Sequence, residues 1–307
     1  MEVEVQGRLL KLSNLDKVMY PAAGFTKGHV IDYYTRVAPV MLGHLRDRPL
    51  TRIRYPNGVD EKFFYEKNCP DHRPEWVEVA RILTRGTGRW GGEGSGPREV
   101  DFCLANDLPT LIWLANLAAL ELHTSLGTVA AYDHPTMVAF DLDPGPPATI
   151  IECCRVALLL REMFEKLGMS CFPKTSGSKG MQVYLPLNTP ATYEETTPLA
   201  KVVAELLEQE HPDLVVSQQS KERRKGKVLV DWSQNVDFKT TVCVYSLRPR
   251  ERPTVSTPLT WDEVEAAREP DDLRFESQEV LERIEEHGDL YAPVIELEQR
   301  LPAGLGG

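Results

Sequence analysis

Apolar and polar residues alternate over several short stretches of the chain, with the period of two that is typical of half-buried β-strands. Val3 and Val5, followed by Leu10 and Leu12, predict a hairpin that turns near Gly7. Further strands are predicted near Thr51, Phe64, Val77 and Val100. The first third of the chain is therefore expected to contain several short strands.

Longer stretches follow the helical period of 3.6 residues instead. Thr26 is placed to cap a helix that extends to about Leu45, with Tyr34, Val37 and Met41 on one face. More helices are predicted at residues 107–120, at residues 148–167 before a stop at Gly168, and at residues 194–210. Thr260-Trp-Asp-Glu263 has capping-box spacing and is expected to open a helical C-terminal region. Because strands and helices intermix, we expect an α+β fold with mostly antiparallel sheets flanked by helices.

The length of the chain allows a large core. At 307 residues and 42% hydrophobic, it can fold as one elaborate domain or as two lobes. We expect residues 1–300 to form this domain and residues 301–307 to form a frayed tail. Residues 85–97 are rich in glycine and predict an exposed, mobile loop.

Two aspartates follow an apolar strand in the middle of the chain. Residues 138–145 read Val-Ala-Phe-Asp-Leu-Asp-Pro-Gly, and side chains alternate along a strand, so Asp141 and Asp143 are expected to point the same way. Carboxylates about 4 Å apart repel by roughly 4 kcal/mol at a partly buried site. A divalent cation reverses that cost. The pair is either a site for Mg²⁺ or Mn²⁺ or a solvated strand end.

A second strand has the same design and favours the metal site. Residues 227–232 read Lys-Val-Leu-Val-Asp-Trp, so an apolar run again ends in a carboxylate, that of Asp231. Three carboxylates on neighbouring strand ends can hold two metal ions, in the arrangement used for phosphoryl or nucleotidyl transfer. Asp231 is therefore the candidate third ligand.

A polar loop lies between these two strands. Residues 174–180 read Lys-Thr-Ser-Gly-Ser-Lys-Gly and lead into an apolar strand at residues 181–185. Gly177 and Gly180 are expected to let backbone N–H groups turn toward an anion, while Ser176 and Lys179 add a hydroxyl and a charge. The loop is either a cradle for a phosphate chain or an ordinary turn, and alone it is a weaker signal than a P-loop.

The charge of the chain limits the kinds of nucleic-acid-binding protein that it can be. The net charge of −11 argues against a general nucleic-acid coat protein, because phosphate binding depends on Lys and Arg. Basic clusters at residues 46–54 and at residues 221–227, which include Arg224, are either solvated loops or contacts to DNA or a triphosphate. We favour the contacts because the proposed site is adjacent.

The cysteines and the N-terminus give no sign of secretion. There is no Cys-x-x-Cys pair, and Cys153 and Cys154 fall in a helical pattern where adjacent side chains diverge, so neither a zinc site nor a disulfide framework is expected. The first residues lack the segments of a signal peptide, and no apolar run approaches a membrane span. We expect a cytoplasmic protein without membrane contact.

Several motifs resemble, in order, the polymerase domain of bacterial ligase D, which belongs to the archaeo-eukaryotic primase superfamily. They are Phe-Asp-Leu-Asp-Pro-Gly at residues 140–145, Thr-Ser-Gly-Ser-Lys-Gly at 175–180, Val-Asp-Trp-Ser-Gln-Asn at 230–235 and Tyr-Ser-Leu-Arg at 245–248. The resemblance covers nearly the whole chain, including Leu-Asp-Lys-Val-Met-Tyr-Pro at 15–21 and Tyr-Pro-Asn-Gly-Val-Asp at 55–60. It implies a primase-like catalytic core.

The resemblance implies a nucleotidyl transferase that adds ribo- or deoxyribonucleotides at DNA ends or gaps during end joining or repair, with two Mn²⁺ or Mg²⁺ ions and a preference for Mn²⁺. Asp141 and Asp143 would bind both metal ions, and Asp231 would complete the one nearer the attacking 3′ hydroxyl. The triphosphate would be held by Ser176, Lys179, Arg248 and His123. His123 is alternatively a structural residue after an apolar helix. The implied partners are DNA with gaps or ends, nucleoside triphosphates, a Ku-like end-binding protein and a DNA ligase.

The resemblance also implies contacts to DNA. Phe63 and Phe64 match an aromatic pair that stacks on the nucleotide or the templating base, or else they pack in the core. Asn14, Lys17 and Lys27 match residues that grip a 5′ phosphate at a gap, or else they are solvated surface side chains.

The chain departs from the family's pattern at two positions. Gln182 stands where histidine is often found after the loop, and Ile53 stands where lysine is often found. These changes bear on catalytic efficiency and sugar preference and permit an alternative function, a catalytically weak nucleotide or DNA-end binding module. A metal-dependent nuclease would use the same carboxylates but no triphosphate cradle. No ligase or nuclease segment follows Leu301, as expected of a stand-alone relative or an isolated domain.

Overall fold

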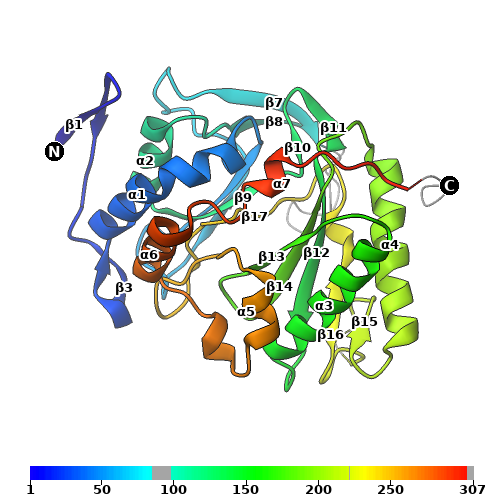
Figure 1. Ribbon diagram of the computed structural model, residues 1–307. Helices are drawn as coiled ribbons and strands as arrows, with labels where there is room; N and C mark the ends of the chain where they lie inside the picture. The colour runs from blue at the N-terminus through cyan, green and yellow to red at the C-terminus, as the bar shows by residue number, and fades with distance from the viewer. Residues whose placement is uncertain (85–97, 221, 303–307) are drawn as a thin grey trace.

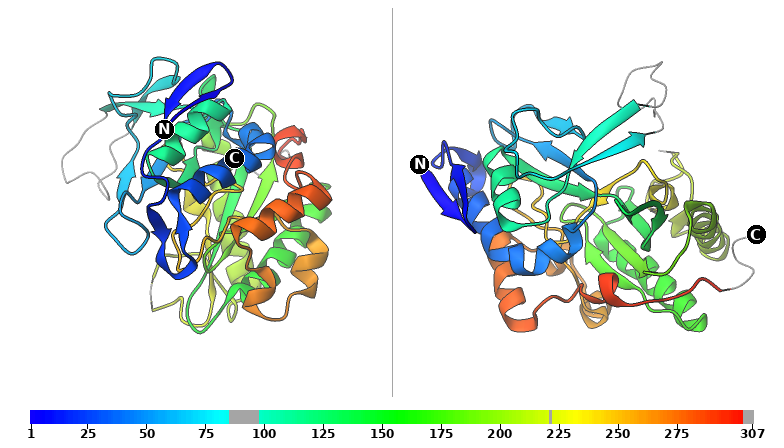
Figure 2. Two further views of the ribbon diagram at one scale, coloured as in Figure 1. Left: turned by 90° about the vertical axis from the view of Figure 1, so that its left-hand side faces the viewer. Right: turned by 90° about the horizontal axis from the view of Figure 1, so that it is seen from above.

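The computed structural model describes residues 1–84, 98–220 and 222–302. Their strands form two main sheets, with the hairpin of β1 (Glu2–Val5) and β2 (Arg8–Lys11) at one end of the molecule and α4 (Tyr193–Glu210) at the other (Figure 1 and Figure 2). The hairpin confirms the alternation read from the sequence. The predicted loop at residues 85–97 lies outside the described residues, as does most of the predicted tail at residues 301–307.

The first sheet is built mainly from the N-terminal half of the chain. Its strands follow the order β17, β9, β5, β8 and β7, with β6 paired to β5, and all its pairings are antiparallel. Their bounds are β5 (Leu50–Arg54), β6 (Phe64–Glu66), β7 (Val79–Thr84), β8 (Arg98–Cys103), β9 (Ala119–Thr124) and β17 (Thr241–Val242). The strands predicted from residues 51, 64, 77 and 100 are therefore present.

Two helices cover this sheet, α1 (Lys27–Leu45) and α2 (Leu108–Asn116). The predicted start of α1 is confirmed, because Thr26 is its N-cap and the His29 ring accepts the Thr26 N–H at 2.9 Å. Tyr34 is fully buried and donates its hydroxyl to the Leu120 carbonyl of β9 at 2.7 Å. This hydrogen bond fixes α1 on the sheet.

The second sheet carries most of the candidate site residues. Its order is β13, β14, β12, β16 and β15, and its neighbours are antiparallel except for β15 and β16. The bounds are β12 (Met137–Pro144), β13 (Phe172–Thr175), β14 (Met181–Pro186), β15 (Val215–Val216) and β16 (Val228–Asp231). The helices α3 (Ile150–Lys166) and α4 pack on it in a second hydrophobic core, close to their predicted positions.

The C-terminal region is helical, as predicted. In its capping box, Glu263 accepts the Thr260 N–H at 2.8 Å. The remaining elements are β3 (Val18–Tyr20), β4 (Phe25–Thr26), β10 (Gly127–Thr128), β11 (Ala131–Pro135), α5 (Trp261–Ala266), α6 (Ser277–His287) and α7 (Pro293–Glu296). In the part of the chain that the structure describes, no helix is both long and apolar enough to cross a bilayer.

The helix predicted at residues 107–120 is too long. Asp107 does cap α2, but the helix ends at Asn116, and Ala118 adopts a left-handed φ of 60° before β9 begins at Ala119. An apolar run that is buried on all sides fits a helix and a strand equally well, so periodicity could not locate this boundary. His123 consequently lies on a strand and not after a helix.

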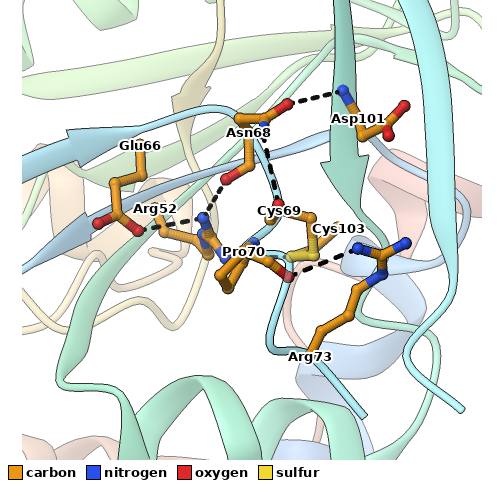
Figure 3. The surroundings of a disulfide bond; sticks show 8 residues. All are labelled: Arg52, Glu66, Asn68, Cys69, Pro70, Arg73, Asp101 and Cys103. Carbon is orange, nitrogen blue, oxygen red and sulfur yellow. Dashed lines mark hydrogen bonds and ion pairs between the residues drawn. A yellow bond between two sulfur atoms is a disulfide. The ribbon is translucent and has the colours of Figure 1, made fainter. Parts of the chain in front are cut away.

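One disulfide, between Cys69 and Cys103, is present where no disulfide framework was expected (Figure 3). Cys69 and Cys103 are 34 residues apart in the sequence, so the spacing rules for neighbouring cysteines do not detect the pair. The pairing of strand backbones brings them together, since the Cys69 N–H donates to the Asp101 carbonyl of β8. Beside the disulfide, the buried Arg52 donates to the Asn68 carbonyl at 2.7 Å and to Glu66 at 3.1 Å (Figure 3).

Candidate active site

The three candidate carboxylates lie on two adjacent strands of the second sheet. On β12, Asp141 and Asp143 flank the fully buried Leu142, so they share a face as the alternation predicted. Asp141 lies directly opposite Asp231 of β16 in the antiparallel register. Adjacent strands therefore bring the third acidic residue beside the first, as the sequence suggested.

A close backbone approach places a cation next to the pair. A side chain at Gly145 would put its Cβ 1.9 Å from the Arg224 carbonyl oxygen, so only glycine fits where the strand ends. The Arg224 side chain forms an ion pair with Asp143. Arg224, predicted to contact DNA, thus contacts a candidate metal ligand in this structure.

The carboxyl group of Asp141 is in an unfavourable electrostatic environment. Burial raises its pKa to about 6, and the neighbouring Asp231 and Asp143 act in the same direction. Gln182 of β14 opposes this by donating its Nε2 to Asp141 Oδ1 at 3.1 Å. A carboxylate that is costly to ionise beside two others is a favourable place for a divalent cation.

Asp231 is held by hydrogen bonds from several neighbours. Its Oδ1 accepts the Ser233 N–H at 2.9 Å, and its Oδ2 accepts the side-chain amides of Gln219 at 2.9 Å and Gln234 at 3.1 Å. Within the described residues, no three His, Cys, Asp or Glu side chains are grouped so that they could hold a metal ion. The donor types suit Mg²⁺ or Mn²⁺, whereas the carboxyl groups are engaged by protein partners.

The polar loop is shorter than predicted, and most of its backbone N–H groups are hydrogen-bonded within the protein. Lys174 and Thr175 belong to β13, so the loop covers residues 176–180. Its backbone N–H groups at 176, 177, 178 and 180 all donate within the protein, so in this structure these four are not directed at an anion. Ser176 Oγ accepts two of them, at 3.2 Å each, which leaves its hydroxyl hydrogen free to donate.

One cavity joins Asp141 and Asp143, two of the three predicted metal ligands, to the predicted phosphate ligands, and Asp231 is not among its lining residues. It has a volume of about 390 Å³ and lies between the two sheets. Its walls include the predicted residues Asp141, Asp143, Ser176, Lys179, Arg248 and His123, together with Gln182, Gln234 and Arg250. The structure therefore brings six predicted residues, from three sequence motifs and from β9, around one space where carboxylates and cations lie together.

Glu121, which sequence reasoning missed, organises the first-sheet side of this cavity. Its side chain is buried, pairs with Arg248 Nε at 3.0 Å and His123 Nε2 at 3.0 Å, and accepts the Tyr55 hydroxyl at 3.3 Å. Burial alone would raise the pKa of Glu121, but these partners outweigh it and hold the pKa below its usual value. The signal was its position two residues from His123, since both share one face of a strand.

Lys174 is a second missed residue. Its side chain is only 1% exposed, and its Nζ donates to Gln182 Oε1 at 2.6 Å, Ser256 Oγ at 2.7 Å and the Val242 carbonyl at 3.1 Å. Burial lowers the pKa of Lys174 to about 7. A lysine in a polar loop motif is not expected in a core, so nothing in the sequence distinguished Lys174 from Lys179.

The aromatic pair does not pack in the core. Phe63 and Phe64 are 46% and 44% exposed, so the core-packing alternative is wrong for both. The Phe63 ring lies 5.6 Å from that of Tyr55, whose hydroxyl reaches Glu121. The pair is therefore linked through Tyr55 to the site.

The residues predicted to grip a 5′ phosphate lie together near the start of α1. The Asn14 carbonyl accepts the Lys17 N–H at 3.1 Å, and the Lys17 carbonyl accepts the Lys27 N–H at 2.8 Å. Lys27 is 5% exposed, and burial together with the charge of Lys17 lowers its pKa. A solvated surface position is therefore wrong for Lys27.

Three of the four arginines in the basic cluster at residues 46–54 are structural, contrary to the favoured interpretation, whereas Arg46 is exposed. Arg48 is buried and donates to the Leu126 carbonyl at 2.7 Å, and Arg54 pairs with Glu66 at 2.9 Å. Arg52 is fully buried beside the disulfide. These guanidinium groups satisfy carbonyls and a carboxylate of the fold itself, which the charge pattern alone could not reveal.

Comparison with known proteins agrees with the motifs. The family model of the LigD primase-polymerase domain matches residues 26–291. The multifunctional non-homologous end joining protein LigD of Mycolicibacterium smegmatis is 42% identical over 287 residues, which are 93% of this chain and 36% of that protein. The bifunctional non-homologous end joining protein LigD of Bacillus subtilis is 32% identical over 280 residues, which are 91% of this chain and 43% of that protein. The chain thus spans less than half the length of these relatives.

A solved structure shares the fold. The polymerase domain from Mycobacterium tuberculosis ligase D, in complex with DNA, matches with a TM-score of 0.84 and 39% sequence identity. The match covers 94% of this chain and 99% of that one. The predicted resemblance and the predicted α+β fold with antiparallel sheets are both confirmed.

Proposed function

Because this chain belongs to the primase-polymerase domain family of ligase D, a family of nucleotidyltransferases, we propose that it adds nucleotides at DNA ends or gaps in non-homologous end joining. The observation that carries the proposal is the cavity of about 390 Å³, whose lining holds Asp141 and Asp143 together with Lys179, Arg248 and Arg250. Transfer of a nucleotidyl group needs metal-binding carboxylates near cations that hold a triphosphate. A nuclease has no use for the second set.

The carboxylates Asp141, Asp143 and Asp231 would hold two Mn²⁺ or Mg²⁺ ions. When bound, such ions stabilise the charge on the attacking and leaving oxygens of an in-line displacement. Their donor chemistry fits, and the pKa of Asp141, raised to about 6, marks a group that a cation would relieve. Asp231 keeps its orientation through Ser233 and two glutamine amides.

The residues of the chain itself would bind and orient the triphosphate. Arg248 is fixed between Glu121 and the Ser176 carbonyl, to which its Nη1 donates at 2.6 Å. Arg250 donates to Ser178 Oγ, which places a second guanidinium at the loop. The Ser176 hydroxyl, whose oxygen already accepts two N–H groups, is left to donate to a phosphate oxygen.

The DNA would lie against residues outside this cavity. Asn14, Lys17 and Lys27 supply adjacent polar and positive groups for a 5′ phosphate, and the exposed rings of Phe63 and Phe64 supply a stacking surface for a base. The solved relative was captured with DNA. A Ku-like end-binding protein and a DNA ligase are the proposed partners in repair.

The test is incubation of a gapped duplex carrying a 5′ phosphate with each nucleoside triphosphate and Mn²⁺. We expect the primer to be extended by the native chain and not by Asp141→Ala. Shortening of the primer would replace the proposal with a nuclease. DNA or nucleotide binding without either change would replace it with the catalytically weak binding module that Gln182 and Ile53 allow.

A further inference from the structure

Lys174 is a buried cation that does not line the cavity but is hydrogen-bonded to a residue that does. It lies on β13, beside Gln182 of β14, and its side chain is 1% exposed. Burying an ammonium group is costly unless all its N–H groups are paired. Its partners are Gln182 Oε1, Ser256 Oγ and the Val242 carbonyl, at distances of 2.6, 2.7 and 3.1 Å.

These partners determine how the Gln182 amide is turned. The Val242 carbonyl can only accept, and Ser256 donates its own hydroxyl hydrogen to the Thr175 carbonyl at 2.9 Å, so it accepts from Lys174. In its charged form Lys174 has three donors and no acceptor, so its third N–H meets an acceptor at Gln182. The amide oxygen of Gln182 therefore faces Lys174.

The orientation of the amide then fixes what Asp141 meets. With the oxygen toward Lys174, the NH₂ group faces the other way and donates to Asp141 Oδ1 at 3.1 Å. The reversed amide would set NH₂ against the ammonium and the amide oxygen against the carboxylate, which are two repulsive contacts. Lys174 therefore reinforces the orientation that the Asp141 carboxylate also favours.

We propose that Lys174 is a positioning residue for Asp141 and acts through Gln182. The proposal rests on the proposed function, in which Asp141 is a metal ligand. Lys174 holds Gln182 as a hydrogen-bond donor, and Gln182 fixes the orientation of the Asp141 carboxylate beside the cavity. The neutral amide of Gln182, oriented by Lys174, thereby donates to Asp141 the hydrogen bond that an imidazole N–H would donate at this position.

The experiment is a double-mutant cycle read out as Mn²⁺ binding to the metal-free protein, without nucleotide or DNA. Free Mn²⁺ is measured by electron paramagnetic resonance for the native chain, Lys174→Met, Gln182→Met and the double variant. Loss of a group that orients a metal ligand costs about 10-fold or more in affinity. We expect each single variant to weaken Mn²⁺ binding by a similar factor, and the double variant to be no weaker than the worse single one.

Two further variants separate positioning from folding. Gln182→His keeps one acceptor and one donor and is expected to retain Mn²⁺ affinity. Arg48→Met removes another buried cation, which donates to the Leu126 carbonyl and to Thr136 and not to Gln182. It is expected to lower the unfolding temperature without changing the Mn²⁺ dissociation constant.

The outcomes are distinct. If Lys174→Met does not fold, Gln182→Met still decides the matter, because unchanged Mn²⁺ affinity in that variant removes the route through which Lys174 is proposed to act. Losses that multiply in the double variant would also overturn the positioning role. A native chain that neither binds Mn²⁺ nor extends a primer would instead defeat the proposed function itself.

Discussion

Arg224 and Asp143 form an ion pair at the end of β12, where the backbone of residue 224 lies against Gly145. A guanidinium on a carboxylate neutralises the charge that would attract a metal ion. In this state of the protein, the basic segment that contains Arg224 therefore competes with a cation for Asp143. DNA phosphates, which also bind arginine, offer Arg224 another partner.

The first prediction follows from this competition. Arg224→Gln should raise the affinity of the DNA-free protein for Mn²⁺ severalfold, because Asp143 loses its internal partner. Mn²⁺ titration by calorimetry measures the change. Arg223→Gln is the matched control, since Arg223 pairs with Glu208 and not with the site. An affinity that is unchanged or lower in Arg224→Gln would contradict the prediction.

The second prediction concerns pH. Asp141 has a pKa of about 6 in the folded protein against an ordinary value of 3.8, so between these values the folded state binds more protons than the unfolded state. The free energy of unfolding therefore falls as pH rises through this window, by about 3 kcal/mol at most. Asp141→Asn should be more stable than the native chain at pH 7.5 without metal, and the difference should vanish near pH 4.

Denaturant unfolding at both pH values measures this difference. Mn²⁺ should stabilise the native chain at pH 7.5 and much less at pH 5, where Asp141 is protonated. It should not stabilise Asp141→Asn. A less stable Asp141→Asn at pH 7.5 would mean that the carboxylate is already compensated within the protein.

The third prediction tests Glu121. Glu121→Gln removes the charge that holds Arg248 and His123 in place at 3.0 Å each. If these residues bind the triphosphate, the KM for the nucleotide should rise about 10-fold, with a smaller change in kcat. Steady-state extension of a gapped duplex gives both constants, and the exposed Glu4→Gln is the control. A fall in kcat at constant KM would place Glu121 outside nucleotide binding.

The sequence predicted helices and strands correctly where the apolar residues followed one period only. The prediction was wrong where they fitted both the helical and the strand period. The amphipathic stretch that forms α1 has both a cap at Thr26 and a clear buried face, and its bounds were predicted. The stretch around Ala118 is apolar throughout, so the change from α2 to β9 depends on a left-handed residue that no pattern marks.

The candidate site likewise contains residues that the sequence predicted and residues that it could not predict. Asp141 and Asp143 could be predicted because alternation on one strand is a local rule, and the family motifs supplied Arg248 and Ser176. Glu121 could not, because its partners come from β9, from residue 55 and from residue 248, which only the folded sheets bring together. The role of a residue cannot be predicted from periodicity or motif spacing when it depends on contacts between segments that are distant in the sequence.

The last prediction concerns the disulfide between Cys69 and Cys103. A cross-link that closes a loop of 34 residues restricts the unfolded chain and typically contributes about 2–4 kcal/mol to the free energy of unfolding. Replacing both cysteines by serine should lower the unfolding midpoint under oxidising conditions and make it insensitive to a dithiol reductant. The native chain with reductant should have an unfolding midpoint close to that of the double variant.

The hairpin beside the disulfide should persist on reduction. Arg52 also links Asn68 and Glu66 there, so the pairing of β5 with β6, which carries Phe64, should remain, and DNA bases should still stack on it. Fluorescence quenching by single-stranded DNA that disappears on reduction would show instead that the disulfide, and not Arg52, holds this hairpin.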